Sequence, residues 1–291
     1  MLQLIVAGLT VGSGYALVAL GIHIILRATR IVNFAQGEFV IAGGLLAYSI
    51  TTWLHASIWV ALAGATTIGF GLGLAFERFV LRPAARVGET AETIATIGTV
   101  YVLLYGHALI WGSLPQPLPF FSGGERDRLF TLGGVELGAQ QLWALALLVV
   151  ALAVLRLFFD RTTYGKAIRA AANNPLGARL VGIDVDRARA VSVGIAIALA
   201  AFGGTLIGPI TLVGGAGGVA ISIKGFVGAI VGGLDSPLGC TLGGLFVGVL
   251  EKLLEGRYGY GIAEPIVYSL LLVTLLVRPA GFFGSRRAVR D

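Results

Sequence analysis

The sequence has 291 residues, of which 56% are hydrophobic and only 12% are charged. A soluble domain carries about twice that share of charged residues, so this composition excludes a soluble domain and indicates an integral membrane protein. The formal net charge of +6 does not indicate nucleic-acid binding, because the basic residues lie in short segments between apolar runs and form no stripe along a folded domain.

Apolar runs long enough to cross a bilayer, which takes about 20 residues, recur along most of the chain. We therefore predict one all-α polytopic transmembrane domain over residues 1–291, with about eight membrane-spanning helices, some of them discontinuous or re-entrant. The predicted spans are residues 2–26, 31–53, 58–76, 93–112, 141–159, 190–213, 221–254 and 262–277. We expect the first span to be retained, because it lacks the basic start and the Ala-x-Ala site of a signal peptide.

The second predicted span opens with "RIVNFAQGEF", which places Asn33, Gln36 and Glu38 in an apolar run. At 100° per residue, Asn33 and Gln36 lie about 60° apart on a helix, whereas Glu38 lies about 140° from Asn33. Either protein encloses the span on all sides, or the helix breaks near Gly37 and the polar groups line a substrate path. Two interpretations of the polar groups remain open, because hydrogen bonds between helices alone could also retain Asn33 and Gln36. Because a charge at membrane depth is costly, we expect a functional role for Glu38.

Two connecting segments are long enough to fold. Residues 114–140 contain three prolines and then two alternating runs around Gly133-Gly134, which predicts a short extracytoplasmic β-hairpin. Residues 160–189 predict two short helices, because Asn174-Pro175 supplies an N-cap followed by proline and Gly182 is a natural helix stop.

The seventh apolar region, residues 221–254, is too long for one span, and Asp235-Ser236-Pro237 interrupts it. We predict a short helix over 221–234 followed by a full span, with the short helix either re-entrant or crossing the membrane.

The distribution of basic residues predicts the orientation. With the N-terminus outside and the C-terminus in the cytoplasm, most of the 21 Lys and Arg residues face the cytoplasm, as the positive-inside rule requires. The exceptions are Arg126, Arg128, Lys224, Lys252 and Arg257.

No catalytic constellation or metal site is predicted. His23, His55 and His107 are far apart in sequence and lie near different membrane faces in this topology. The chain has no nucleotide-binding P-loop, because Gly165-Lys166 is followed by Ala167. Cys240 is expected to be a small core residue.

Five ordered motifs carry a family resemblance over essentially the whole chain. They are "RIVNFAQGEF", "RPAAR" with "IATIG", "GKAIRAAANNPLGARLVGIDVDR", "KGFVGAIVGGLDSPLGCTLGGLFVGVLE" and "RPAGFFG". In this order they resemble the LivH-type permease subunits of branched-chain amino-acid ABC importers. The chain departs from the family pattern at Gln36, where the family commonly has His, and at Asn173 or Asn174, where it commonly has an acidic residue.

The resemblance implies several partners: a second, LivM-like permease, two ABC ATPase subunits and an extracytoplasmic substrate-binding protein. It implies a bacterial inner-membrane location, with ATP used by the partner subunits and no cofactor in this chain. It also implies that residues 160–189 dock onto the ATPase. The matching positions are Gly165, Lys166, Arg169, Asn174, Pro175, Ala178, Arg179, Leu180 and Gly182.

We therefore predict a permease subunit, not an enzyme, that imports branched-chain or related amino acids by alternating access. The predicted substrate path combines the Asn33–Glu38 stretch with the second, glycine-rich break. Its residues are Asn33, Gln36, Gly37, Glu38, Lys224, Gly225, Gly232, Gly233 and Ser236. One alternative is import of urea, short amides or another amino-acid class, and another is a self-sufficient channel or ion-coupled carrier.

Overall fold

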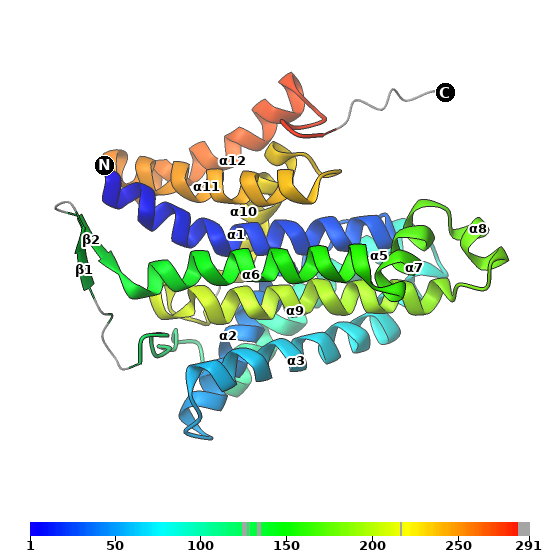
Figure 1. Cartoon of the computed structure of the whole chain (residues 1–291), viewed down its shortest axis with the longest axis horizontal. Helices are drawn as coiled ribbons and strands as arrows, with labels where there is room; N and C mark the ends of the chain where they lie inside the picture. The colour runs from blue at the N-terminus through cyan, green and yellow to red at the C-terminus, as the bar shows by residue number, and fades with distance from the viewer. Residues whose placement is uncertain (124–126, 128, 133–134, 216, 285–291) are drawn as a thin grey trace.

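The computed structural model describes residues 1–123, 127, 129–132, 135–215 and 217–284. Over these residues the fold is an all-α bundle with one small hairpin (Figure 1). Seven helices are long and apolar enough to cross a membrane, counting α3 to α4 as one continuous helix. The long helices are α1 (Leu2–Thr29), α3 (Ile58–Phe76), α5 (Glu89–Trp111), α6 (Ala139–Arg161), α9 (Val185–Thr211), α11 (Pro237–Tyr258) and α12 (Tyr260–Val277).

Helix α1 occupies the centre of the bundle and is buried along most of its length. It runs beside α6, α9 and α11 along the long axis of the molecule (Figure 1). Its contact with α11 is made through glycine: a Cβ atom on Gly248 would lie only 2.3 Å from the Cα atom of Gly12. The small residues therefore allow the two backbones to touch, as they do in other membrane bundles.

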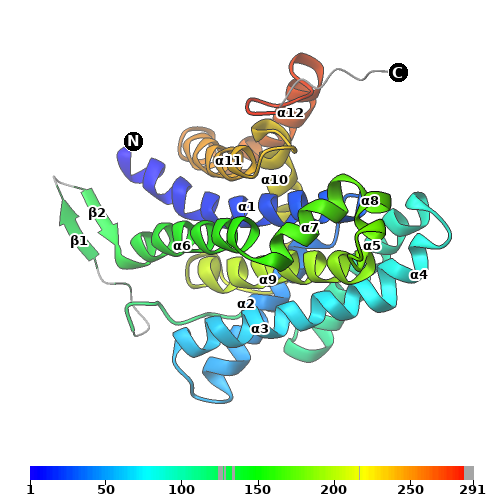
Figure 2. The same ribbon diagram turned by 45° about the vertical axis from the view of Figure 1, so that its right-hand side comes forward.

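The bundle has two distinct ends. The N-terminus and the hairpin lie at one end, which we call the hairpin end (Figure 1). The opposite end carries α7 (Thr163–Asn173) and α8 (Pro175–Leu180), which lie close to α4 (Arg82–Ala85) in Figure 2. We call residues 160–189 the knob and this end the knob end.

The hairpin is confirmed. Strand β1 (Leu129–Leu132) pairs antiparallel with β2 (Val135–Gly138), with Leu129 opposite Gly138. The predicted Gly133-Gly134 turn lies outside the described residues. The preceding loop is held against the bundle by Gln140, whose amide accepts from the Phe121 backbone N–H at 3.1 Å and donates to the Leu206 carbonyl at 2.9 Å.

The two short helices of the knob are also confirmed. The Thr162 hydroxyl accepts from the Gly165 N–H at 2.9 Å, and the Asn174 side chain accepts from the Gly177 N–H at 2.9 Å. Each bond caps the first turn of a helix. Gly182 follows α8 with φ of 82°, a left-handed conformation that glycine adopts without steric cost.

Two helices are shorter than a full span. α10 (Gly217–Gly232) precedes the long α11, which confirms the predicted short helix before a full one. α2 (Gln36–Thr52) differs from the prediction for residues 31–53, because residues 31–35 are not helical. The backbone is therefore interrupted, as one of the two interpretations expected, but the interruption precedes Gln36, and Gly37 lies in the first turn of α2.

A π-helical turn, η1 (Glu77–Leu81), joins α3 to α4 at the knob end. It presents Glu77 to the interior, where the carboxylate lies 3.4 Å from the Arg82 guanidinium and 3.6 Å from that of Arg189. Arg189 also pairs with Glu92 at the start of α5. This ionic cluster joins three helices and leaves no isolated buried charge among its members.

Candidate functional site: the crossing of helices α2 and α10

Helix α2 begins inside the bundle. Hydrogen bonds from a nearby side chain and from α10 satisfy backbone groups of the non-helical residues before it. Arg30 ends α1 in a left-handed conformation with φ of 65°. The Asn33 side-chain oxygen then accepts from the Ala35 N–H at 3.1 Å, which stabilises the turn into α2. The Phe34 carbonyl accepts from the Ser222 hydroxyl of α10 at 3.0 Å. The short non-helical segment is therefore held in place by its own side chain and by α10.

Asn33 and Gln36 are buried and satisfied by hydrogen bonds. The Asn33 amide donates to the Gln36 side-chain oxygen at 3.1 Å. The Gln36 amide in turn donates to the Ala196 carbonyl of α9 at 2.9 Å. Gln36 thus joins the start of α2 to α9, which supports the interpretation that it makes a hydrogen bond between helices, whereas the Asn33 side chain bonds only locally.

Gly37 is where α2 touches α10. Its N–H donates to the Ser222 hydroxyl at 2.6 Å. A Cβ atom at Gly37 would lie 1.9 Å from the Gly218 carbonyl oxygen, and one at Gly218 would lie 2.2 Å from a Glu38 carboxylate oxygen. A side chain at Gly37 would therefore separate the two backbones, whereas one at Gly218 would displace the Glu38 carboxylate.

Glu38 is fully buried and faces the beginning of α10. Among the described residues, neither of its carboxylate oxygens has a hydrogen-bond partner. The nearest titratable group is His107 of α5, whose Nδ1 atom lies 3.7 Å from a Glu38 oxygen. His107 is also buried, and its Nδ1 atom likewise lacks a hydrogen-bond partner.

Sequence reasoning assigned no role to His107 and treated the three histidines as unrelated structural residues. The structure places His107 beside Glu38 although 69 positions separate them in the chain. The local sequence around His107 contains no signal for this pairing, because it arises from the packing of α5 on α2.

Lys224 belongs to a different cluster from Asn33 and Glu38. Its ammonium group lies 2.6 Å from the Glu251 carboxylate of α11 and 3.4 Å from that of Glu264 on α12. The Tyr268 hydroxyl donates to Glu264 at 2.8 Å. The predicted path residue Lys224 therefore lies on the far side of α10 from Ser222, and sequence reasoning missed both of its acidic partners.

The other predicted path residues on the second break do not reach the α2 start. Gly225 packs against Val18 of α1. Gly232 packs on Gly239, and Gly233 forms the turn after α10 with φ of 104°. The Ser236 hydroxyl accepts from the Gly239 N–H at 3.1 Å and caps α11. Gly232, Gly233 and Ser236 thus belong to the tight turn between α10 and α11 at the knob end.

The knob presents apolar side chains away from the bundle. Ala178 is buried inside it, whereas Leu176, Leu180 and Val181 are 74%, 89% and 75% exposed. Of the predicted docking residues, Lys166, Arg179 and Gly182 are exposed, while Gly165 is buried against the Phe158 backbone. Pro175 is the first residue of α8. Arg169 is bound within the chain, because its guanidinium donates to the Asp160 carboxylate at 2.8 Å.

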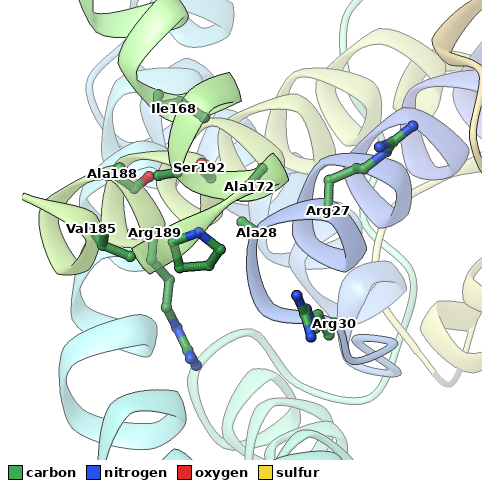
Figure 3. Close-up of a pocket in the computed structure, with 11 residues that line it drawn as sticks. Arg27, Ala28, Arg30, Ile168, Ala172, Val185, Ala188, Arg189 and Ser192 are labelled. Carbon is green, nitrogen blue, oxygen red and sulfur yellow. Dashed lines mark hydrogen bonds between the residues drawn. The ribbon is translucent and has the colours of Figure 1, made fainter. Parts of the chain in front are cut away.

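A small pocket of about 50 Å³ lies between the knob and the bundle, where α7 packs on α1 and α9. Figure 3 shows it between the end of α1, which carries Arg27 and Arg30, and α9, which carries Arg189 and Ser192. Arg27 lines this pocket, but its guanidinium points out of it and donates to the Asp235 carbonyl, in the turn before α11, at 3.0 Å. The knob thus adjoins both the last turn of α1 and the start of α9.

Residues 4–277 match the family described as branched-chain amino acid transport system / permease component. The branched-chain amino acid permease protein BraD of Pseudomonas aeruginosa is 30% identical over 297 residues, covering 97% of this chain and 95% of that protein. LivH of Escherichia coli is 29% identical, with the same coverage of both chains.

A solved structure, PsaBC from Streptococcus pneumoniae in complex with Fab, aligns over 94% of this chain and 91% of that chain. Its TM-score is 0.53 at 13% sequence identity, so the likeness shows a shared fold alone. The family match extends over nearly the whole chain and agrees with the apolar helical bundle. The chain is a multi-pass membrane protein and belongs to the permease components of branched-chain amino acid transport systems.

Proposed function

We propose that this chain is the transmembrane permease subunit of an ATP-driven importer for branched-chain or related amino acids. The observation that carries the proposal is the family match over residues 4–277. BraD and LivH, which resemble it over almost their full length, are branched-chain amino acid transport permeases. The chain itself performs no covalent chemistry in this proposal, needs no cofactor, and ATP is hydrolysed by partner subunits.

The α2–α10 crossing is the proposed substrate path. It combines interrupted backbone, closely packed glycines and a buried carboxylate, features that transporters gather where a path crosses the membrane. Alternating access then requires that α10 moves relative to α2, with the two helices in contact when the path is closed.

The knob is the proposed docking site for an ATPase subunit. Leu176, Leu180 and Val181 place apolar surface on the polar end of the bundle, and exposed apolar surface of this kind indicates a protein partner. Because the knob packs against α9 and lies beside α1, a force on the knob would reach the helices that support the α2 start.

A second permease is the proposed neighbour of the interrupted segment. Phe34 lies in the non-helical stretch before α2 and is 41% exposed. Irregular backbone at membrane depth is stable only where protein or a water-filled cavity covers it. A LivM-like chain packed over Phe34 would provide this cover, and an extracytoplasmic substrate-binding protein would deliver the amino acid at the hairpin end.

The importer is tested by uptake into proteoliposomes. We expect this chain alone to transport no leucine, and the complex with its second permease, two ATPase subunits and binding protein to transport leucine only with ATP. Uptake by the chain alone without ATP would support a self-sufficient channel or carrier instead. ATP-dependent uptake of urea or acetamide, with none of leucine, would support the amide importer.

The docking proposal is tested by adding charge to the knob surface. Leu176→Glu together with Leu180→Glu should lower ATPase copurification and uptake by about tenfold or more, because both side chains are exposed and would face an apolar partner. Val87→Glu is the matched control, since Val87 is 82% exposed at the same end but outside the knob. Normal copurification of the double variant would place the ATPase elsewhere. Arg169 is a poor probe, because its pairing with Asp160 makes its replacement structural.

A further inference from the structure

Glu38 presents a carboxyl group whose oxygens have no hydrogen-bond partner in the described protein. Its side chain is fully buried, and neither oxygen accepts a hydrogen bond. His107 lies at 3.7 Å, which is beyond hydrogen-bond distance. A buried carboxylate normally has a paired cation and several hydrogen-bond donors, because its desolvation is otherwise costly. The two buried oxygens without a protein partner make Glu38 a candidate ligand-binding group.

The N-terminus of α10 faces the same carboxylate. The position of a Cβ atom on Gly218, the second residue of α10, would lie 2.2 Å from one Glu38 oxygen and 2.8 Å from the other. The first N–H groups of a helix have no partner within the helix and carry a partial positive charge. In the closed arrangement the Glu38 carboxylate lies beside this helix end without accepting a hydrogen bond from it.

Two glycines form the contact between α2 and α10 beside Glu38, and we infer that this contact opens during transport. Gly37 and Gly218 bring the two backbones together without interlocking side chains. The Ser222 hydroxyl makes the polar links across the crossing, because it accepts from the Gly37 N–H and donates to the Phe34 carbonyl. When α10 moves away from α2, the carboxylate and the helix end would face each other across a gap, one negative and one positive.

We propose that this gap is the receptor for the charged groups of the substrate, an α-amino acid zwitterion. The Glu38 carboxylate binds the α-ammonium group, and the N-terminus of α10 binds the α-carboxylate. In the closed state Glu38 lies against the first turn of α10, which closes the empty path. His107, whose Nδ1 atom lies 3.7 Å from Glu38, is a positioning residue that packs beside the carboxylate. This inference rests on the proposed function and adds to it the chemical groups that are recognised.

The test measures binding to the purified complex of both permeases and the ATPase, without the binding protein. The probes are leucine, 3-methylbutylamine, which lacks the carboxylate, and 4-methylpentanoate, which lacks the ammonium group. The readout is the ligand-induced rise of the unfolding temperature at equal ligand concentration. We expect leucine to bind about tenfold or more tightly than either analogue, since each analogue loses one charged contact. Equal stabilisation by leucine and an analogue would overturn the proposal.

Variants of Glu38 separate recognition from folding. Glu38→Gln should abolish the response to leucine while the complex still binds Mg-ATP, and Glu38→Asp, which keeps the charge, should retain part of it. His107→Gln should weaken leucine binding less than Glu38→Gln. Glu264→Gln is the matched control, because it removes a carboxylate outside the crossing and should leave the leucine response intact.

The uptake assay distinguishes failure of this inference from failure of the proposed function. ATP-dependent leucine uptake at the wild-type rate by Glu38→Gln would overturn the zwitterion receptor and leave the importer intact. Absence of ATP-dependent uptake by the wild-type complex would overturn the importer itself. If Glu38→Gln does not fold, the comparison of the three probes on the wild-type complex still decides the question.

Discussion

Lys224 shows how a single buried charge is accommodated in this bundle. Its side chain extends from the short α10 toward α11 and α12, where Glu251 and Glu264 neutralise it. Lys224 also lies 5.7 Å from the ring centre of Tyr260, a distance at which a cation and an aromatic ring attract. The cluster fixes α10 to two helices on the side opposite to the proposed path.

Removing this lysine should be strongly destabilising. Lys224→Met leaves Glu251 buried without its cation, for which we expect a loss of about 3–5 kcal/mol in the free energy of unfolding. Adding Glu251→Gln should recover part of the loss, because the uncompensated charge is then removed. Thermal unfolding of the purified protein in detergent measures both values. A single variant as stable as the wild type would show that Lys224 is not ionically paired.

At the scale of elements, glycine decides how closely the central helices approach. Gly12 and Gly248 meet between α1 and α11, and Gly244 lies against Ala16 in the same interface. Elsewhere the glycines are not all equivalent. Gly98 of α5 has nothing within 4 Å of the position its Cβ would occupy.

This difference predicts opposite outcomes for two glycine substitutions. Gly248→Leu should prevent α1 and α11 from packing and should reduce the yield of folded protein, since its side chain would collide with the backbone of Gly12. Gly98→Ala should be neutral or stabilise the protein by about 0.5–1 kcal/mol, because alanine is the better helix former. Size-exclusion profiles and unfolding temperatures report both effects. Equal tolerance of the two substitutions would contradict the close helix contact.

The elements that sequence could predict are those defined by local signals. The knob was predictable because Asn174 caps and Gly182 stops a helix within a few residues, and the hairpin because its strands alternate around a glycine turn. The start of α2 was misplaced because it depends on contacts with Ser222 and Ala196, which lie far away in the chain. No local pattern contains that information.

The candidate site was predictable only in part for the same reason. Asn33, Gln36 and Glu38 stand out as polar residues in an apolar run, but the partner His107 could be found only by packing α5 on α2. The placement of Lys224 also depended on the structure. Ser222 and Lys224 lie about 200° apart on a helix, so Lys224 faces away from α2 once Ser222 is known to face it.

At the scale of the whole molecule, the two ends differ in charge. The knob end carries the α3–α4 arginines and those of the knob, whereas the hairpin end carries few basic residues. The positive-inside rule therefore predicts that the knob end faces the cytoplasm, with the N-terminus outside and the C-terminus inside.

This orientation can be measured with introduced cysteines. Cys240, the single cysteine, is buried, so Cys240→Ser gives a background without reactive thiols. In that background Leu114→Cys at the hairpin end should react with a membrane-impermeant maleimide on intact spheroplasts. Val87→Cys at the knob end should react only after the membrane is permeabilised. The reverse pattern would invert the topology.

The four tryptophans of the chain lie together at the hairpin end, at or beside the ends of α2, α3, α5 and α6. The Trp53 and Trp111 rings stack at 6.5 Å, and Trp59 meets Trp143 edge to face at 4.9 Å. Intrinsic fluorescence of this subunit is therefore a probe of one end only. Its emission should shift when a protein binds at the hairpin end and should stay constant when a tryptophan-free partner binds the knob, so the spectrum separates the two docking events without any label.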